Sequence, residues 1–125
     1  MKVLIKGDII DFVPVFNAYI DEGRLIINKD GNLSLTVDTG FSGGIALPPN
    51  VLNNLNLELA FYDTFRLATG EIVELPVFIG EVTIGNSEVE TWFIPGDYLL
   101  GMEFLSFAGS VLLLDFENEE VKLMK

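Results

Sequence analysis

Short apolar runs separated by turn-forming residues recur along the whole of this 125-residue chain. Runs rich in β-branched and aromatic residues alternate with clusters of Gly, Pro, Asn and Asp at intervals of about 8–12 residues, a spacing typical of sandwiches and barrels. No low-complexity segment divides the chain, and no apolar run reaches the roughly 18 residues that a membrane-spanning helix needs. We therefore expect one all-β domain that spans residues 1–125.

The apolar runs and the turns between them define the expected elements. Strands are expected over residues 3–10, 13–20, 25–27, 33–38, 61–68, 71–84, 89–94, 111–116 and 121–124. Residues 28–31 end in Asp-Gly and predict a tight hairpin, whereas Pro76 and Gly80 predict interruptions of the long strand. A short helix is expected over residues 102–108. Residues 50–57 form either a second short helix or a surface turn.

Composition excludes several kinds of site and partner. The chain has no histidine and no cysteine, so Ser-His and Cys-His catalysis are excluded, and we expect neither a metal site nor another cofactor. With 19 acidic and 7 basic residues the formal charge is −12, which repels phosphate backbones, and no nucleic-acid partner is expected. No membrane partner is expected either. Charged residues interrupt the N-terminal segment before a signal-peptide core could form, so the expected location is cytoplasmic.

The stretch from residue 33 to residue 43 carries the main candidate for chemistry. It runs as an apolar strand into Asp38 and then breaks at Gly40 and Gly43. Acidic residues are rarely buried unless they are paired or functional, and no cationic residue lies nearby in the sequence. Glycines let the backbone turn sharply and approach other groups closely. Asp38 is therefore the candidate for a catalytic acid.

Two motifs make this candidate more specific. Residues 38–41 read Asp-Thr-Gly-Phe, with Leu-Pro at residues 47–48, and residues 99–102 read Leu-Leu-Gly-Met. On these motifs the chain resembles the retropepsin-like aspartic proteases of clan AA, the single-domain class that includes retroviral proteases, and more narrowly their small prokaryotic members. The resemblance spans roughly residues 13–124. It implies a closed β-barrel with one or two short helices that acts as a homodimer.

The resemblance implies catalysis by a pair of carboxylates. In such a pair, one ionised acid takes a proton from water while a neutral acid donates one to the substrate carbonyl. Because the chain has a single Asp-Thr-Gly, the second acid must come from a second copy. Asp38 would be the acid and base, Thr39 would hydrogen-bond across the dimer axis, and Gly40 would allow the close backbone approach. The expected function is thus an aspartic endopeptidase that acts on polypeptide substrates.

The resemblance also implies residues that bind the substrate. Ala68, Thr69 and Gly70 fall where the family has its flap, a hairpin that closes over substrate, although they also suit a plain hairpin tip. A second set would line substrate subsites: Leu99, Leu100 and Gly101, with Val77 and Ile79. The four apolar residues of this set also suit the core without any function. Trp92 is expected in the core.

Phe41 departs from the family pattern, in which alanine or serine is usual at this position. Its ring either faces the site and narrows the cleft, or packs in the core, and we include it among the expected substrate contacts. Ser42 offers a substitute hydroxyl if it points toward the site.

Two other functions fit the same residues. One is a catalytically inactive retropepsin-fold dimer that binds peptides or another protein by strand pairing. The other is a small lipocalin-like or OB-like binding barrel, which leaves Asp38 without a role. Asp38-dependent cleavage by a dimer separates the protease from both.

Overall fold

The computed structural model describes all 125 residues and contains eleven strands and two short helices, so the all-β prediction is confirmed. The elements, in chain order, are β1 (Val3–Ile10), β2 (Val13–Asp21), β3 (Arg24–Ile27), β4 (Leu33–Val37), β5 (Ile45–Leu47), α1 (Pro49–Leu52), β6 (Glu58–Arg66), β7 (Ile72–Ile84), β8 (Ser87–Pro95), β9 (Leu99–Leu100), α2 (Met102–Ala108), β10 (Val111–Asp115) and β11 (Glu120–Met124). Neither helix is long and apolar enough to cross a membrane.

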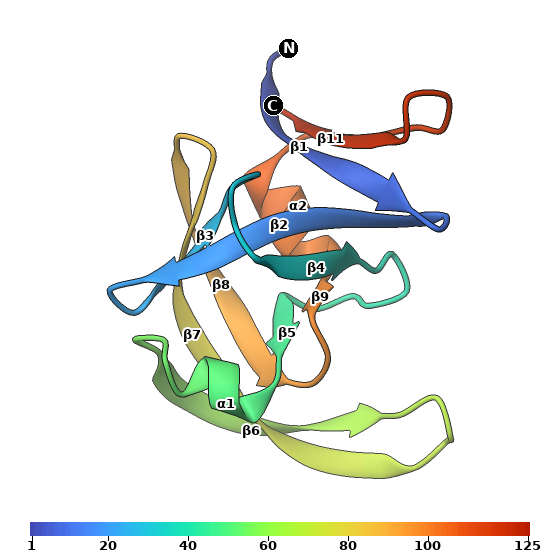
Figure 1. The fold of residues 1–125 in the computed structure, drawn as a ribbon. Coiled ribbons are helices and arrows are strands. Elements are labelled where there is room, and N and C mark those ends of the chain that lie inside the picture. Colours follow the sequence, from blue (N-terminus) through green and yellow to red (C-terminus); the bar gives the residue numbers. More distant parts are fainter.

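All eleven strands belong to one hydrogen-bonded sheet. Its order is β10-β11-β1-β2-β3-β7-β8-β5-β9-β4, and β6 pairs with β7 beside this path. β4 also pairs with β2, through the antiparallel partners Val15–Thr36 and Phe16–Leu35, so the path of pairings returns to β2. Figure 1 shows β1 and β11 at one end of the molecule and the β6–β7 hairpin at the other.

The hairpin expected at residues 28–31 is wrong. β3 and β4 flank this segment but do not pair with each other; each pairs with β2, and Ala18 is the partner of both Ile27 and Leu33. Gly31 explains the crossing, because a Cβ atom there would lie 2.1 Å from the carbonyl oxygen of Ala18. Only glycine lets the chain pass so close to β2 as it runs from β3 to β4, the second strand that pairs with β2.

The interruptions expected at Pro76 and Gly80 are also wrong, since β7 runs unbroken over thirteen residues. β8 pairs with β7 only from Phe78 onward, so one edge of β7 is unpaired at Pro76 and its missing N–H is tolerated. At Gly80 a Cβ atom would lie 2.3 Å from Leu57, so glycine there makes room for that side chain. α1 ends at Leu52, shorter than the helix considered for residues 50–57.

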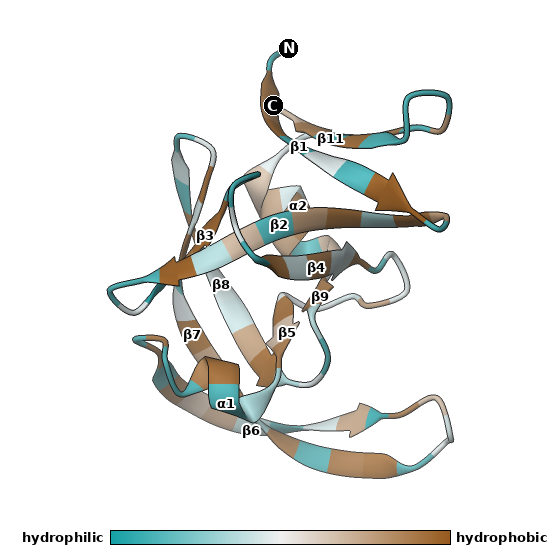
Figure 2. Cartoon of the chain, in the orientation of Figure 1, coloured by the Kyte–Doolittle hydropathy of each residue, from teal (hydrophilic) through white to brown (hydrophobic).

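A single core of 21 buried hydrophobic residues holds the sheet together. Phe16, Phe93 and Phe104 are its largest fully buried side chains, and each such ring is worth roughly 1.5–3 kcal/mol of burial. Along β2, hydrophobic residues are interspersed with polar ones, as a strand with one face on a core requires (Figure 2). β6 differs, because Phe65 is its only residue that is not exposed. The β6–β7 hairpin therefore projects from the core.

Candidate active site

Asp38 directly follows β4 and begins a loop that ends at β5. β4 pairs in parallel with β9, where Thr36 is the partner of Leu99 and Val37 the partner of Leu100. The N–H of Asp38 continues this ladder and donates to the carbonyl oxygen of Leu100 at 3.0 Å. The two motifs that the sequence keeps far apart thus lie side by side.

Backbone hydrogen bonds hold the Asp38 loop, residues 38–44, against β9 and the start of α2. The N–H of Gly101 donates to the carbonyl oxygen of Gly44 at 2.7 Å, and that of Met102 to Phe41 at 2.8 Å. A Cβ atom on Gly101 would lie 2.1 Å from the carbonyl oxygen of Gly43, so glycine is required for this close approach. The loop therefore has a fixed position relative to the core.

The Asp38 carboxylate is partly exposed and has one partner, the N–H of Gly40, which donates to Oδ1 at 2.9 Å. It has no ion pair, because both ion pairs of the structure belong to Arg24. Thr39 and Gly40 are exposed beside it. The acid is thus held in place by its own loop and remains free to meet another group.

A cavity of roughly 240 Å³ lies between the Asp38 loop and the β6–β7 hairpin. Its lining residues come from five parts of the chain: Phe41, Gly43, Gly44, Phe61, Asp63, Phe65, Val77, Trp92, Ile94 and Glu103. Of the two orientations considered for Phe41, the structure has the ring on the cavity side, folded over Gly43, where a Cβ atom would come within 2.8 Å of it. Asp38 and Ser42 do not line this cavity.

The tip of the β6–β7 hairpin carries the three residues expected in a flap. Ala68, Thr69 and Gly70 are exposed and do not line the cavity. Gly70 has a φ of +89°, which glycine adopts without strain, and its N–H closes the turn onto the carbonyl oxygen of Leu67 at 2.9 Å. The tip is therefore an ordered turn at the end of a projecting arm.

The three expected subsite residues of β9 and its end differ in access. Leu99 is partly buried, Leu100 is fully buried in the core and Gly101 is buried against the Asp38 loop. The side chain of Leu100 packs on core residues and does not reach a surface that a ligand could contact. In contrast, Trp92, expected in the core, is partly buried and lines the cavity.

The lining residues that sequence reasoning missed include four with aromatic or acidic side chains: Phe61, Asp63, Phe65 and Glu103. A signal for three of them exists, because the pattern Phe-x-Asp-x-Phe puts residues 61, 63 and 65 on the same face of a strand. Glu103 has no such signal. Its place at the cavity depends on how α2 packs against the Asp38 loop.

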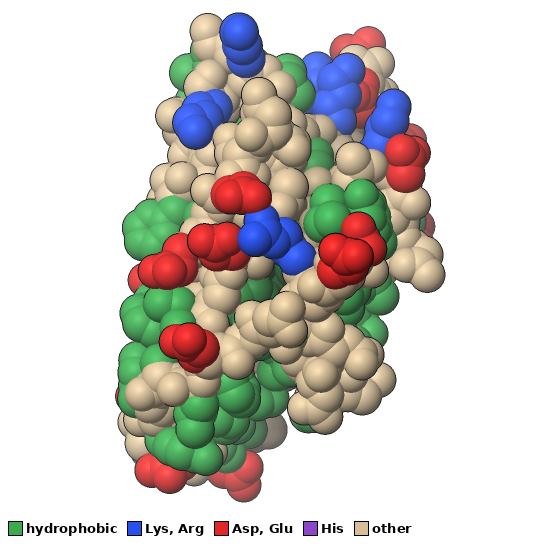
Figure 3. Space-filling model, turned by 90° about the vertical axis from the view of Figure 1, so that its left-hand side faces the viewer, with side chains coloured by type: hydrophobic (Ala, Val, Ile, Leu, Met, Phe, Trp, Pro, Cys, Tyr) green, Lys and Arg blue, Asp and Glu red, His purple; other side chains and the backbone are tan.

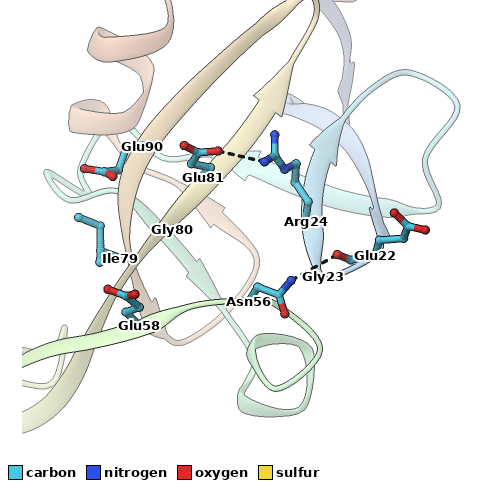
Figure 4. A pocket seen from close by; sticks show the side chains of 9 residues that line it. All are labelled: Glu22, Gly23, Arg24, Asn56, Glu58, Ile79, Gly80, Glu81 and Glu90. Carbon is cyan, nitrogen blue, oxygen red and sulfur yellow. Dashed lines mark hydrogen bonds and ion pairs between the residues drawn. The ribbon is translucent and has the colours of Figure 1, made fainter.

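A cavity of roughly 370 Å³ around Arg24 contains one residue expected at a subsite, Ile79, and four of its nine lining residues are glutamates. In Figure 4 Arg24 points toward Glu81, with which it pairs at 3.0 Å, and Asn56 reaches the carbonyl oxygen of Glu22 at 3.4 Å. Arg24 also pairs with Glu88, so these contacts connect β3 to β7 and β8. No group of three or more His, Cys, Asp or Glu side chains is arranged to hold a metal ion.

Comparison with known proteins found no match: no protein-family model, no curated protein and no solved structure matches this chain.

Proposed function

We propose that this protein is an aspartic endopeptidase that works as a homodimer, with one Asp38 carboxylate supplied by each copy. The observation that carries the proposal is an acid without a cationic partner at the end of a buried strand, on a loop that backbone hydrogen bonds fix to Leu100, Gly101 and Met102. Catalytic carboxylates need such a fixed position and no competing cation.

The sheet supports a retropepsin-like barrel for this proposal. β4, which ends the path of pairings, is also hydrogen-bonded to β2, so seven strands from β2 to β4 form a continuous ring of pairings. The β6–β7 hairpin lies outside this ring and suits the role of a flap.

An apolar surface at the terminal strands supports a second copy. β10 ends the sheet with one unpaired edge and exposes Val111, Leu113 and Leu114. Phe116 is 66% exposed and Phe12 is 91% exposed, and both line one surface cavity. Asp11 and Phe12, with φ of +50° and +68°, form the two-residue turn between the paired residues Ile10 and Val13, so the Phe12 ring lies at the tip of the β1–β2 hairpin. An unpaired strand edge beside exposed apolar side chains can pair with a strand of another chain and bury these side chains.

The arrangement of these parts suits a two-fold dimer. In Figure 1 the β1–β2 turn, the β10–β11 turn, the loop after β4 and the tip of the β6–β7 hairpin all lie on the right-hand side of the molecule. A second copy related by a two-fold axis on this side would bring two Asp38 loops face to face and two hairpins over the space between them.

In this dimer the two Asp38 carboxylates share one proton, because like charges held about 3 Å apart do not both ionise. The ionised carboxylate takes a proton from a water molecule, whose oxygen attacks the carbonyl carbon of the scissile peptide. The protonated carboxylate donates its proton to the carbonyl oxygen, which gives a gem-diol. The carboxylate that is now protonated donates to the nitrogen while the other takes a proton from a diol hydroxyl. The C–N bond breaks, the amine and the carboxylic acid leave, and the pair again holds one proton. The N–H of Gly40 keeps Oδ1 of Asp38 oriented, and Thr39 hydrogen-bonds across the axis.

Asp38→Asn tests the proposal, since asparagine keeps the shape of the side chain but cannot carry the proton. Wild type is expected to cleave members of a denatured-protein peptide pool, read by mass spectrometry, and Asp38→Asn is expected to lose this by at least a hundred-fold while circular dichroism and dimer mass stay unchanged. Equal cleavage by both proteins would contradict the proposal. Dimers of both that bind peptides without cleaving them would support the alternative, a catalytically inactive retropepsin-fold binding module.

A further inference from the structure

The cavity between the Asp38 loop and the β6–β7 hairpin combines aromatic walls with two acids. Its four rings and two carboxylates are those of Phe41, Phe61, Phe65, Trp92, Asp63 and Glu103, and no Lys or Arg lines it. At roughly 240 Å³ it is smaller than the pockets that take drug-sized ligands and matches the size of one long side chain.

Glu103 supplies the most specific signal. Its Oε1 atom is buried and has no hydrogen-bond partner in the chain. A carboxylate oxygen withdrawn from water without a donor destabilises the folded protein, so such atoms are usually paired. Because both ion pairs of the structure use Arg24, no cation of the chain serves Glu103. Because Oε1 is closed off from water, a donor in the cavity pairs with it only when the Glu103 side chain rotates toward the cavity, whose wall this residue forms in part.

The aromatic side chains favour a cation as that donor. Phe61 and Trp92 meet edge to face, with ring centroids 5.5 Å apart and planes at 68°. The face of an aromatic ring attracts ammonium and guanidinium groups, most strongly in the case of tryptophan. Phe65, the one residue of β6 that is not exposed, adds a further ring. The carboxylates would pair with the charged head of the cation, while the rings would cover its apolar stem.

The surroundings of the cavity carry the matching charge. Along β6, β7 and the turn between them there are five acidic residues, Glu58, Asp63, Glu71, Glu74 and Glu81, against Arg66 alone, and Glu90 follows on β8. Figure 3 shows the left-hand side of the view in Figure 1; on that side Lys and Arg side chains lie in the upper half, and only acidic ones mark the lower end of the molecule, the end at which the β6–β7 hairpin lies. A field of one sign attracts ligands of the other.

We propose that this cavity binds a lysine or arginine side chain of the polypeptide substrate. The identity of the ligand as a substrate residue rests on the proposed function, whereas the binding of the basic side chain needs no catalysis. Phe41 and the β6–β7 hairpin then determine which substrate residue is accepted at or near the cleaved peptide bond. The enzyme prefers basic polypeptides.

The single tryptophan of the chain offers a direct readout, because Trp92 lines the cavity. Titration with N-acetyl-arginine amide or N-acetyl-lysine amide is expected to change its fluorescence in a saturable way, and N-acetyl-norleucine amide, which lacks the charge, is expected to change it at least ten-fold less at equal concentration. Peptides of several residues that contain arginine are expected to bind more tightly than agmatine, the free amine. Tighter binding of agmatine would overturn the assignment to a polypeptide.

Variants make the test specific. Glu103→Gln is expected to weaken arginine-amide binding at least ten-fold, whereas Asp30→Asn, an exposed change between β3 and β4 that lies outside the cavity and outside the β6–β7 hairpin, is expected to leave it unchanged. Asp63→Asn, on the exposed strand β6, gives a second reading should Glu103→Gln fail to fold. Norleucine binding equal to arginine binding, or wild-type affinity in the folded acid variants, would overturn the proposal.

The same titration on Asp38→Asn keeps the two proposals separate, since Asp38 does not line the cavity. Arginine-amide binding by Asp38→Asn equal to that of wild type is expected. Cleavage that depends on Asp38 without any preference for basic residues would contradict the assignment of this cavity alone and leave the protease intact.

Discussion

The backbone N–H of Asp38 donates a hydrogen bond of 3.0 Å to the carbonyl oxygen of Leu100. This bond joins the end of β4 to the end of β9, immediately before Gly101. The Asp38 loop and the start of α2 consequently form one hydrogen-bonded unit, and what disturbs one part is expected to disturb the other.

Gly101→Ala tests this unit. The new Cβ atom would lie 2.1 Å from the carbonyl oxygen of Gly43, so the loop must shift, and the free energy of unfolding is expected to fall by about 1–3 kcal/mol. The matched control is Gly96→Ala, whose Cβ would meet only the Cβ of Ala46, at 3.3 Å, and which is expected to cost less. Urea denaturation of both variants measures the difference, and equal midpoints would contradict the close packing at Gly101.

Dimer formation is expected to depend on the apolar surface at the terminal strands. Sedimentation equilibrium at micromolar concentration is expected to give twice the chain mass of 13.8 kDa for wild type. Phe116→Glu puts a charge on this surface and is expected to raise the Kd of the dimer at least ten-fold. Leu59→Glu, on the equally exposed β6, is expected to leave the mass unchanged. A monomeric wild type at every concentration would remove the catalytic proposal together with the dimer.

Thr39 is expected to act on the dimer and not on the monomer. Its side chain is exposed at the candidate axis, so Thr39→Ala removes one hydrogen bond from each copy, worth about 1 kcal/mol each. The Kd of the dimer is then expected to rise roughly thirty-fold. Thr39→Ser keeps the hydroxyl and is expected to dimerise like wild type. If the serine and alanine variants weaken the dimer equally, the hydroxyl has no role in it.

The β10–β11 turn is expected to respond to acid through Asp115. The side-chain amide of Asn118 donates to Oδ2 of Asp115 at 2.8 Å, and the backbone N–H of Asn118 donates to Oδ1 at 3.1 Å. These hydrogen bonds hold the pKa of Asp115 below its ordinary value of 3.8. A carboxyl with a lowered folded-state pKa stabilises the folded state above its ordinary pKa and loses this effect as the pH falls through the lowered one. Wild type is therefore expected to have a larger free energy of unfolding than Asp115→Asn at pH 7, and this difference is expected to shrink as the pH falls below 3.8. Urea denaturation of both proteins at pH 7 and below pH 3.8 measures it. An advantage that grows in acid would contradict this.

Local sequence signals were sufficient to predict helix α2 and the hairpins, because the hydrogen bonds of these elements join residues that are close in the sequence. Gly101 and Gly109 flank α2, and the predicted bounds of that helix agree with the structure. The terminal hairpin, β10 with β11, and the turn at Gly85 were likewise predicted from turn residues next to apolar runs. Gly31 misled the prediction, because its role is a contact with Ala18 on a strand far away in the sequence. Pairing across such distances is decided by packing and leaves no local pattern.

The candidate site likewise has one part that could be predicted from the sequence and one part that could not. Asp38 and Leu100 were found from their motifs, and the structure brings them together through β4 and β9. The aromatic cavity was not predicted, because Glu103 on α2 and Asp63 on β6 meet only when the hairpin folds over the Asp38 loop. The alternating pattern of β6 was the one local trace of that face.

Crosslinking of the two Asp38 positions tests the central claim most directly. The chain has no cysteine, so Asp38→Cys gives each copy a single thiol, and a short bifunctional maleimide reports whether two of them lie close together. The control, Asp21→Cys, is exposed at the far end of β2, on the opposite side of Figure 1. We predict that Asp38→Cys forms a covalent species of twice 13.8 kDa in high yield and that Asp21→Cys does not. Crosslinking of Asp38→Cys at or below the level of Asp21→Cys would contradict the shared two-carboxylate site.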